Sequence, residues 1–597
     1  MGDQKNLILA AVLSFLVIGL WEVFVIAPQR EELQRNAEIQ AQVAQEQGID
    51  GVPVPVGEGN LAAEVSALLG RDDALAQTDR ITIDAPRVDG SISLTGGRID
   101  DLNLKDYHVT IEEGSPEVTV LSPREAGDAY YALMGWAGSG AMPGPRTEWS
   151  LAEGTTLDQG KPITLAWDNG AGLAFTQRYE IDENFLFTVT QSVTNTTEEA
   201  TTLSPYGVIA RHGEPETEGF YLLHEGAIAG FDGVTHSVDY DDFSEFEMNV
   251  AERARVKKFT AEDNGWIGIT DKYWMTALIP KTHQPFTGAF KLAGREGAPV
   301  FSADVRMPPV SVAPGATETS VIQLFAGAKQ ADVLRMYERT LEAESFYDAI
   351  DWGWFFFLTK PFFWILNTIY KLVGNFGIAI ILLTVLVKTV MFPLAYKSYV
   401  SMGRMKKLQP QTEKLREKHK DDPQAMQRAM LELYKKEKVN PASGCLPILL
   451  QIPVFFALYK VLFVTIEMRH APFFGWVQDL AAPDPTSIFT LFGLIDWSPP
   501  TFLMIGIWPL IMGVTMWLQM QLNPAPPDPI QKKIFAWMPV LFTFLLGSFP
   551  AGLVIYWTAN NILTIIQQST IMKSQGAKIE LWDNLKGMFT RSKKPEG

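Results

Sequence analysis

The stretch that decides the fold runs from Asn375 to Leu394 and reads NFGIAIILLTVLVKTVMFPL. It is long and apolar enough to cross a bilayer as a helix. Lys388 lies roughly 18 Å from the start of the apolar run at about 1.5 Å per residue, past the middle of the hydrocarbon. Such an ammonium either extends along its own stem to the interface or faces a polar interior. We favour a polar cavity, with Thr384 on the same helix face because it lies four residues earlier.

Charge is divided unequally along the chain. Residues 1–350 hold 25 Lys and Arg against 53 Asp and Glu, a net charge of −28, whereas residues 351–597 have a net charge of +10. Such asymmetry indicates two compartments or two kinds of partner. Cys445 is the single cysteine, so an intrachain disulfide is excluded.

The N-terminal half is predicted to be an exported domain on a membrane anchor. The apolar run in residues 1–28 lacks a small-residue cleavage site, which favours an uncleaved anchor over a signal peptide. Residues 29–80 are rich in Gln, Ala and Glu and lack aromatics, as in a flexible linker. Residues 81–330 alternate short strand patterns with turns and predict one large all-β sandwich. Its histidines lack metal-ligand spacing and its carboxylates lack a partner nucleophile, so neither a metal site nor a catalytic site is expected.

The topology follows from the position of basic residues. Residues 397–438 carry 12 Lys and Arg against 6 Asp and Glu, which is typical of a cytoplasmic segment. One crossing must therefore precede it, and the second transmembrane helix, residues 375–396, supplies that crossing. Residues 331–374 then form a connecting helix, expected at 332–348, and an amphipathic helix, expected at 352–373, which lies flat on the outer membrane surface.

Residues 397–440 are predicted to form a cytoplasmic helical hairpin of coiled-coil type. Asp422 is expected to cap its second arm, with Pro423 as the first helical residue. Its charge suits anionic lipid headgroups or ribosomal RNA, and the sequence leaves both open. The basic side chains expected to make these contacts are Arg404, Lys406, Lys407, Lys414 and Arg416.

Residues 441–572 are predicted to supply transmembrane helices three to six, followed by a basic cytoplasmic tail at 573–597. The spans are expected at 446–466, 501–522, 534–549 and 551–572, which gives six spans with both termini inside. In the last span Trp557, Asn561, Thr564 and Gln568 fall on one face at helical spacing. Polar side chains of this kind either join helices or line a cavity. Together with Lys388 they favour a shared hydrated cavity. A secondary transporter of a small anionic solute using Lys388 is the weaker alternative, because the last five spans hold no deep carboxylate.

Three motifs resemble the signature of the YidC membrane-protein insertases. They read NPASGCLPILLQIPVFFALY at 440–459, DPIQKK at 528–533 and FPAGLVIYW at 549–557. The resemblance covers residues 350–572, and GWIGITDKYW at 265–274 extends it more loosely into the β-domain. The Gram-negative form of this family has a large periplasmic β-supersandwich after the first span.

This resemblance implies a protein that is not an enzyme and needs no cofactor or metal. A five-helix core would hold a hydrophilic groove, and a nascent segment would slide past the third and fifth of the six helices into lipid. The implied partners are nascent membrane proteins, the Sec translocon, membrane lipids and, through the hairpin and tail, the ribosome or signal-recognition machinery, but no DNA. The implied groove residues are Thr384, Lys388, Gln451, Tyr556, Trp557, Asn561 and Thr564. Lys388 stands where the family commonly has arginine, and Trp557 where it has a functional tyrosine.

Overall fold

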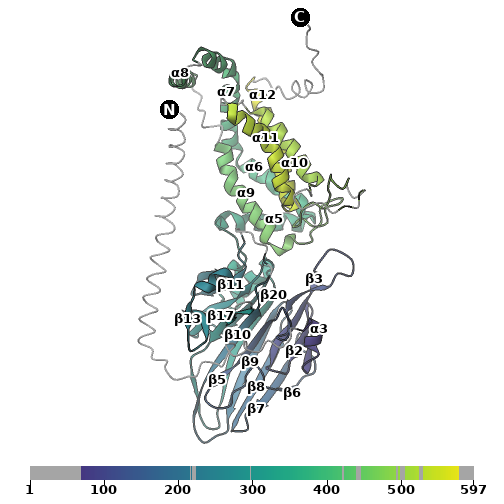
Figure 1. Cartoon of the computed structure of the whole chain (residues 1–597), viewed down its shortest axis with the longest axis vertical. Helices are drawn as coiled ribbons and strands as arrows, with labels where there is room; N and C mark the ends of the chain where they lie inside the picture. The colour runs from purple at the N-terminus through teal and green to yellow at the C-terminus, as the bar shows by residue number, and fades with distance from the viewer. Residues whose placement is uncertain are drawn as a thin grey trace. The chain divides into compact units, whose positions relative to one another are not determined.

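The computed structural model describes residues 69–215, 217, 223–295, 298–419, 422–437, 446–491, 495, 497, 505–523 and 529–576 (Figure 1). Its described residues divide into a β unit, which runs up to Asp351 and includes Val464–Ile466, and a helical unit formed by the other residues from Trp352 onward. The predicted anchor at 1–28, the linker up to residue 68 and the tail from residue 577 lie outside the described residues. Each unit is described by itself.

The β unit contains two antiparallel sheets, which confirms the all-β prediction for this part of the chain. The first sheet follows the order β1-β2-β3-β5-β10-β18-β17-β14-β13, with β4 paired to β3 and β19 to β10. Its strands are β1 (Arg80–Asp84), β2 (Val88–Ser93), β3 (Arg98–His108), β4 (Glu117–Leu121), β5 (Tyr130–Gly138), β10 (Thr201–His212), β13 (Glu247–Asn249), β14 (Ala254–Ala261), β17 (Phe286–Arg295), β18 (Ala298–Arg306) and β19 (Val310–Val312).

The second sheet follows the order β12-β11-β15-β16-β20-β9-β8-β7-β6. Its strands are β6 (Ser150–Glu153), β7 (Ile163–Asp168), β8 (Leu173–Ile181), β9 (Leu186–Asn195), β11 (Gly226–Phe231), β12 (Val234–Asp239), β15 (Gly265–Thr270), β16 (Trp274–Pro280) and β20 (Thr317–Ala328). Along β8 and β9 buried and half-buried residues alternate, as expected for strands with one face against a core.

Hydrogen bonds between the sheets show that they face each other. The Tyr179 hydroxyl on β8 donates to the Gly97 carbonyl at 2.8 Å, and the Gln177 amide donates to the Met134 carbonyl on β5 at 2.8 Å. Burying these polar groups costs little because each has a partner. The predicted sandwich is therefore formed by two facing sheets.

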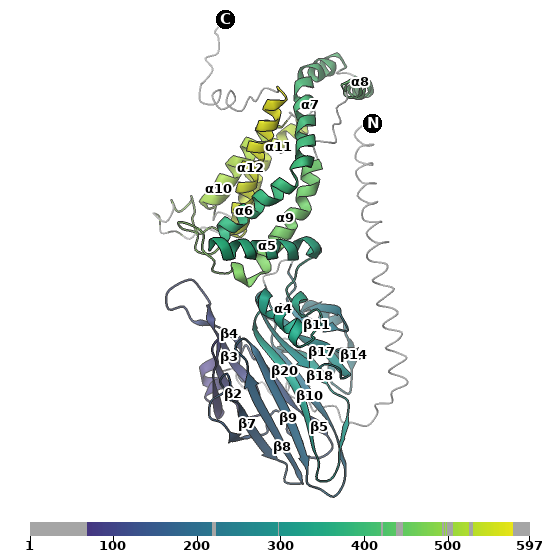
Figure 2. The same cartoon turned by 180° about the vertical axis from the view of Figure 1, so that it is seen from behind.

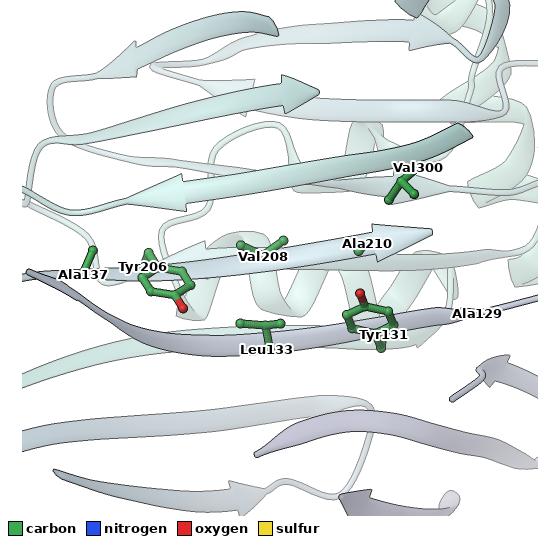
Figure 3. Packing of buried hydrophobic residues seen from close by; sticks show 8 residues of the cluster. All are labelled: Ala129, Tyr131, Leu133, Ala137, Tyr206, Val208, Ala210 and Val300. Atoms are coloured by element: carbon green, nitrogen blue, oxygen red, sulfur yellow. The ribbon is translucent and has the colours of Figure 1, made fainter. Parts of the chain in front are cut away.

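An apolar cluster lies on the first sheet (Figure 3). The register pairs Val208 with Leu133 and Tyr206 with Gly135, which places these side chains on one face. A Cβ at Gly135 would lie 2.8 Å from the Tyr206 hydroxyl oxygen, so the absence of a side chain there makes room for the ring. The cluster consists of Ala129, Tyr131, Leu133, Ala137, Tyr206, Val208, Ala210 and Val300.

Short helices complete the β unit. They are α3 (Arg71–Leu75), η3 (Asp241–Glu245), α4 (Ala331–Thr340) and η4 (Phe346–Ala349). The Trp266 ring packs edge-on against Phe346 with centroids 5.1 Å apart, and its Nε1 donates to the Glu344 carbonyl at 3.0 Å. The GWIGITDKYW motif therefore holds the segment that follows α4 on the sandwich.

The helical unit contains eight α-helices within the described residues (Figure 2). They are α5 (Phe356–Val373), α6 (Phe376–Val390), α7 (Phe392–Lys418), α8 (Pro423–Lys436), α9 (Leu446–Val464), α10 (Ile507–Leu522), α11 (Pro529–Leu545) and α12 (Ala551–Ser574), with short 3₁₀ turns η6 (Ile466–Met468) and η8 (Leu546–Ser548). The Asp422 side chain accepts the N–H groups of Gln424 and Ala425 at 3.0 Å each, which confirms the predicted cap of α8.

The helix expected at 375–396 is interrupted at Met391. α6 ends at Val390 and α7 begins at Phe392, and the two axes are bent by 69°. Pro393 explains the break, because it has no N–H to donate and its ring crowds the carbonyl of Thr389. By length and composition, this bent pair could cross a membrane, whereas no unbroken helix in the described part of the chain meets that test.

Candidate functional site

Helix α12 carries a row of buried polar side chains, here called the polar line. Its members share low solvent exposure although they lie on a mostly apolar helix: Thr558, Asn560, Asn561, Thr564 and Gln568. Polar groups in such surroundings need hydrogen-bond partners or water. The partners on other elements come from α6 and from α10 with its C-terminal cap, so the polar line joins both helices to α12.

The lysine of the opening stretch contacts the polar line. The Lys388 Nζ on α6 donates to the Thr564 hydroxyl at 2.8 Å. Thr564 in turn donates to the Asn560 carbonyl at 2.6 Å, which leaves its oxygen as an acceptor for the ammonium. Thr384 is buried one turn before Lys388, but its hydroxyl donates to the Ile380 carbonyl of its own helix at 2.7 Å. Thr384 therefore shapes the surroundings of Lys388 without bonding to it.

A second pair joins α9 to α12. The Gln451 amide donates to the Tyr556 hydroxyl at 2.6 Å. The neighbouring Trp557 ring lies 4.8 Å from Phe455 on α9 and 5.7 Å from Phe542 on α11, measured between centroids. The indole thus contacts α9 and α11, which correspond to the third and fifth of the six expected spans. These are the spans past which the family resemblance predicts that a nascent segment slides.

Asn561 contacts a different helix from the one that its spacing with Thr564 predicted. Its amide donates to the Thr515 hydroxyl on α10 at 3.2 Å, so it holds α10 against α12 and does not contact Lys388. The single polar face expected from residues 557, 561, 564 and 568 is therefore divided among contacts with different helices. Gln568 donates to Asn523 Oδ1 at 3.0 Å.

Three polar atoms on α12 are buried without a hydrogen-bond partner among the described residues. They are Thr558 Oγ1, Asn560 Oδ1 and Gln567 Oε1. Unpaired acceptors of this kind mark positions where water or a polar ligand group gains most from binding. Asn560 and Gln567 are visible in the sequence as polar residues within an apolar span. Thr515 gave no such signal, because a lone threonine in a helix usually bonds to its own backbone.

The basic residues of the hairpin are not equivalent. Arg404 and Lys414 are exposed, whereas Lys406 and Arg416 are half-buried. The Lys407 Nζ donates to the Gln575 carbonyl at 2.5 Å, at the C-terminal end of α12. A cation there satisfies a terminal carbonyl and complements the helix dipole. Below it, Tyr399 and Met402 pack against Ile571, so the first part of α7 is fixed to α12.

Comparisons with known proteins agree along the whole chain. A family model described as 60Kd inner membrane protein matches residues 368–578, and one described as YidC periplasmic domain matches residues 80–365. The membrane protein insertase YidC of Dinoroseobacter shibae is 51% identical, with 100% of both chains covered. That of Methylorubrum extorquens is 48% identical, with 99% of both chains covered. A crystal structure of an active YidC insertase is 17% identical with a TM-score of 0.34, covering 82% of this chain and 91% of that one.

Proposed function

The chain belongs to the YidC family of membrane protein insertases, and we propose that it moves nascent hydrophobic segments into the inner membrane while the polar line of α12 receives their polar flanks. The observation that carries this proposal is the Lys388–Thr564 contact, a charged group held against buried polar residues between largely apolar helices. Such an arrangement is costly in lipid and is retained where it serves a function. The anionic-solute transporter is not supported, because the relatives are named as insertases.

The polar line lowers the cost of moving a polar flank into the membrane. A nascent segment has an apolar part that partitions into lipid and a flank whose backbone and charges do not. Unpaired acceptors such as Asn560 Oδ1 offer partners to that flank or to water accompanying it. The Lys388 ammonium attracts carboxylates of short acidic tails. No covalent bond is made or broken, so binding and release suffice for this account.

The apolar part of the segment would leave between α9 and α11. Trp557 lies against Phe455 and Phe542 at this position, so its ring is the first surface that a departing side chain meets. Exposed apolar side chains continue outward on both helices, among them Phe456 on α9 and Leu541 on α11. Both helices therefore present apolar side chains to a departing segment.

We propose six spans with both termini inside and residues 29–350 outside, where the β unit corresponds to the periplasmic domain of the family. Helix α5 would lie flat on the outer surface. Its Phe357, Trp364 and Leu372 are exposed, whereas Phe363 and Leu366 are buried, as expected for a helix with one face in lipid headgroups. A cysteine placed in 400–418 in a Cys445→Ala chain should react only from the cytoplasmic side, and reaction only from outside would refute this topology.

The partners are inferred from charge. Arg404 and Lys414 are exposed on α7 and suit anionic lipid or ribosomal RNA, whereas Lys407 is engaged with α12. We propose that ribosome or signal-recognition contacts use the exposed residues. We also propose that the protein inserts clients either alone or together with the Sec translocon.

Reconstitution tests the function directly. Purified full-length protein in phosphatidylethanolamine and phosphatidylglycerol vesicles should insert a single-span apolar client without an ion gradient, measured by protease protection. Vesicles without the protein set the background. Insertion at that background level, by protein that is folded and correctly oriented, would refute the proposal.

A further inference from the structure

The loop between α9 and α10, residues 470–488, contacts the N-terminal ends of three helices. α6, α10 and α12 begin at Phe376, Ile507 and Ala551. The first N–H groups of any helix lack partners within the helix and need them from elsewhere. The loop provides partners for the first N–H groups of α10 and α12, and at α6 it accepts a hydrogen bond from the capping residue Asn375.

The contact with α10 is made by side chains. Asp484 Oδ2 accepts the N–H of Trp508 at 2.9 Å, and the Thr486 hydroxyl accepts the N–H of Ile507 at 2.9 Å. The Thr486 hydroxyl also donates to Asp484 Oδ1 at 2.7 Å, which couples the two acceptors. A Cβ at Gly506 would lie 2.3 Å from the Asp484 side chain, so a glycine is needed for the carboxylate to approach this closely.

The contact with α12 is made by backbone. The N–H of Ala551 donates to the Ala482 carbonyl at 2.7 Å, and the N–H of Gly552 donates to the Leu480 carbonyl at 3.0 Å. Both acceptors lie within four residues of Asp484. The position of the Asp484 carboxylate therefore fixes residues 480–482, which contact the start of α12.

The contact with α6 combines a cap with ring packing. Asn375 Oδ1 accepts the N–H of Ile378 at 3.0 Å, while its amide donates to the Phe473 carbonyl at 3.2 Å. A Cβ at Gly377 would lie 2.0 Å from a carbon of the Phe473 ring, so the ring lies directly on the helix backbone. The helix that carries Lys388 is thereby fixed to the same loop.

Asp484 is the buried charge at the centre of these contacts. Its residue is 3% exposed, and Oδ1 also accepts the Trp476 Nε1–H at 3.1 Å and the N–H of Thr486 at 3.0 Å. A carboxylate with this many donors at a helix N-terminus is held firmly, because each bond is charge-assisted and the helix dipole adds to them. Removing it leaves N–H groups unpaired at a position shielded from water, which is expensive.

We propose that Asp484 is a positioning residue that holds the 470–488 loop as an ion-tight closure over the outer end of the helical unit. This inference rests on the proposed function, because an intramembrane polar line needs a barrier on one side. Without such a barrier, water along Lys388 and Asn560 would connect the two compartments and dissipate the proton gradient. The loop thus separates insertion from leak.

Proton leak in proteoliposomes tests the closure. Full-length protein is reconstituted in phosphatidylethanolamine and phosphatidylglycerol vesicles loaded with a pH-sensitive dye, and a potassium gradient with valinomycin drives proton entry. Wild type should leak at the rate of empty vesicles. Asp484→Ala should raise the leak about tenfold above the wild-type rate, the factor to which about 1.4 kcal/mol corresponds. Asp484→Asn, which keeps one oxygen acceptor, should lie between the two.

Two further variants make the result decisive. Gln478→Ala removes an exposed polar side chain from the same loop and should leave the leak unchanged. Thr486→Val keeps the shape of the side chain but removes the acceptor for the N–H of Ile507, so this variant should leak more than wild type. It tests the closure also in the case where Asp484→Ala does not fold. A purely structural role would lower Tm without leak. Folded Asp484→Ala and Thr486→Val proteins that leak at the wild-type rate would overturn the inference.

Client insertion in the same vesicles separates the two proposals. If wild type inserts the client and the folded variants do not leak, the closure is refuted and the insertase function stands. Wild type that inserts no client refutes the insertase function, whatever the leak rates are.

Discussion

Substituting Lys388 tests whether its charge acts on clients. A client carboxylate that does not displace Thr564, 2.8 Å from Nζ, would approach the ammonium through one water molecule. At about 6 Å and an effective dielectric constant of about 40, one such pair contributes about 1.4 kcal/mol. That corresponds to about tenfold in the equilibrium for entry of the tail.

The expected order of variants follows from this magnitude. Lys388→Arg should stay near wild type, because the charge and the reach are kept. Lys388→Ala should reduce insertion of a client with one acidic residue in its translocated tail about tenfold, and Lys388→Glu about a hundredfold, because repulsion of similar size replaces attraction. The same client with a neutral tail should be little affected by either change.

Paired clients make the assay specific. Acidic and neutral versions of one client are inserted by each variant in the same vesicles, and the protected fraction is measured against time. Lys533→Ala, which removes an exposed lysine on α11, serves as the charge control. Equal losses for both tails would refute charge attraction and leave hydration or helix packing as the role of Lys388.

Other predictions concern stability. Gly135→Ala should destabilise the β unit by about 1–3 kcal/mol, because the new Cβ would lie 2.8 Å from the Tyr206 hydroxyl, whereas Gly144→Ala has open space and should be neutral in the same thermal melt. Burial and the nearby Arg124 lower the pKa of His212 from 6.5 to about 4. The stability of the β unit should therefore be constant above about pH 7 and fall by at most about 3 kcal/mol towards pH 4, because the unfolded chain takes up a proton there. Hydrogen exchange in β10 measured against pH should show this fall, and His212→Gln should remove it. Lys407→Ala should speed hydrogen exchange at residues 571–576 by removing the contact with Gln575, whereas Arg404→Ala should not, and equal exchange in both would refute the capping role.

The architecture was predictable where sequence patterns are long and regular. The alternating strand patterns across residues 81–330 predicted the all-β unit, and Asp422-Pro423 predicted the start of α8. The break at Met391 was missed, because hydropathy is continuous through Pro393 and a proline in an apolar run signals a kink only when its backbone consequences are considered. The segment expected to be helical at 332–348 ends its α-helix at Thr340.

The candidate site was predictable in its residues but only partly in their contacts. Helical spacing placed Asn561 and Thr564 on similar faces, yet Thr564 meets Lys388 while Asn561 meets Thr515. Spacing specifies the direction of a side chain and not the helix that packs there. For the same reason the sequence grouped Lys407 with Arg404, although Lys407 caps α12. Loop contacts such as that of Asp484 have no periodic signal at all.

The most direct test of the account is where a client contacts α12. A photo-crosslinking residue is placed at position 564, on the polar line, or at position 562, which is exposed and on the apolar side of the same helix. Ribosome-bound chains of increasing length carry a client whose polar flank is marked by a unique protease site. The account predicts that the flank crosslinks at 564 at intermediate lengths and is released at longer ones, while position 562 captures lipid. Crosslinks to the flank at 562 but not at 564 would contradict the role of the polar line.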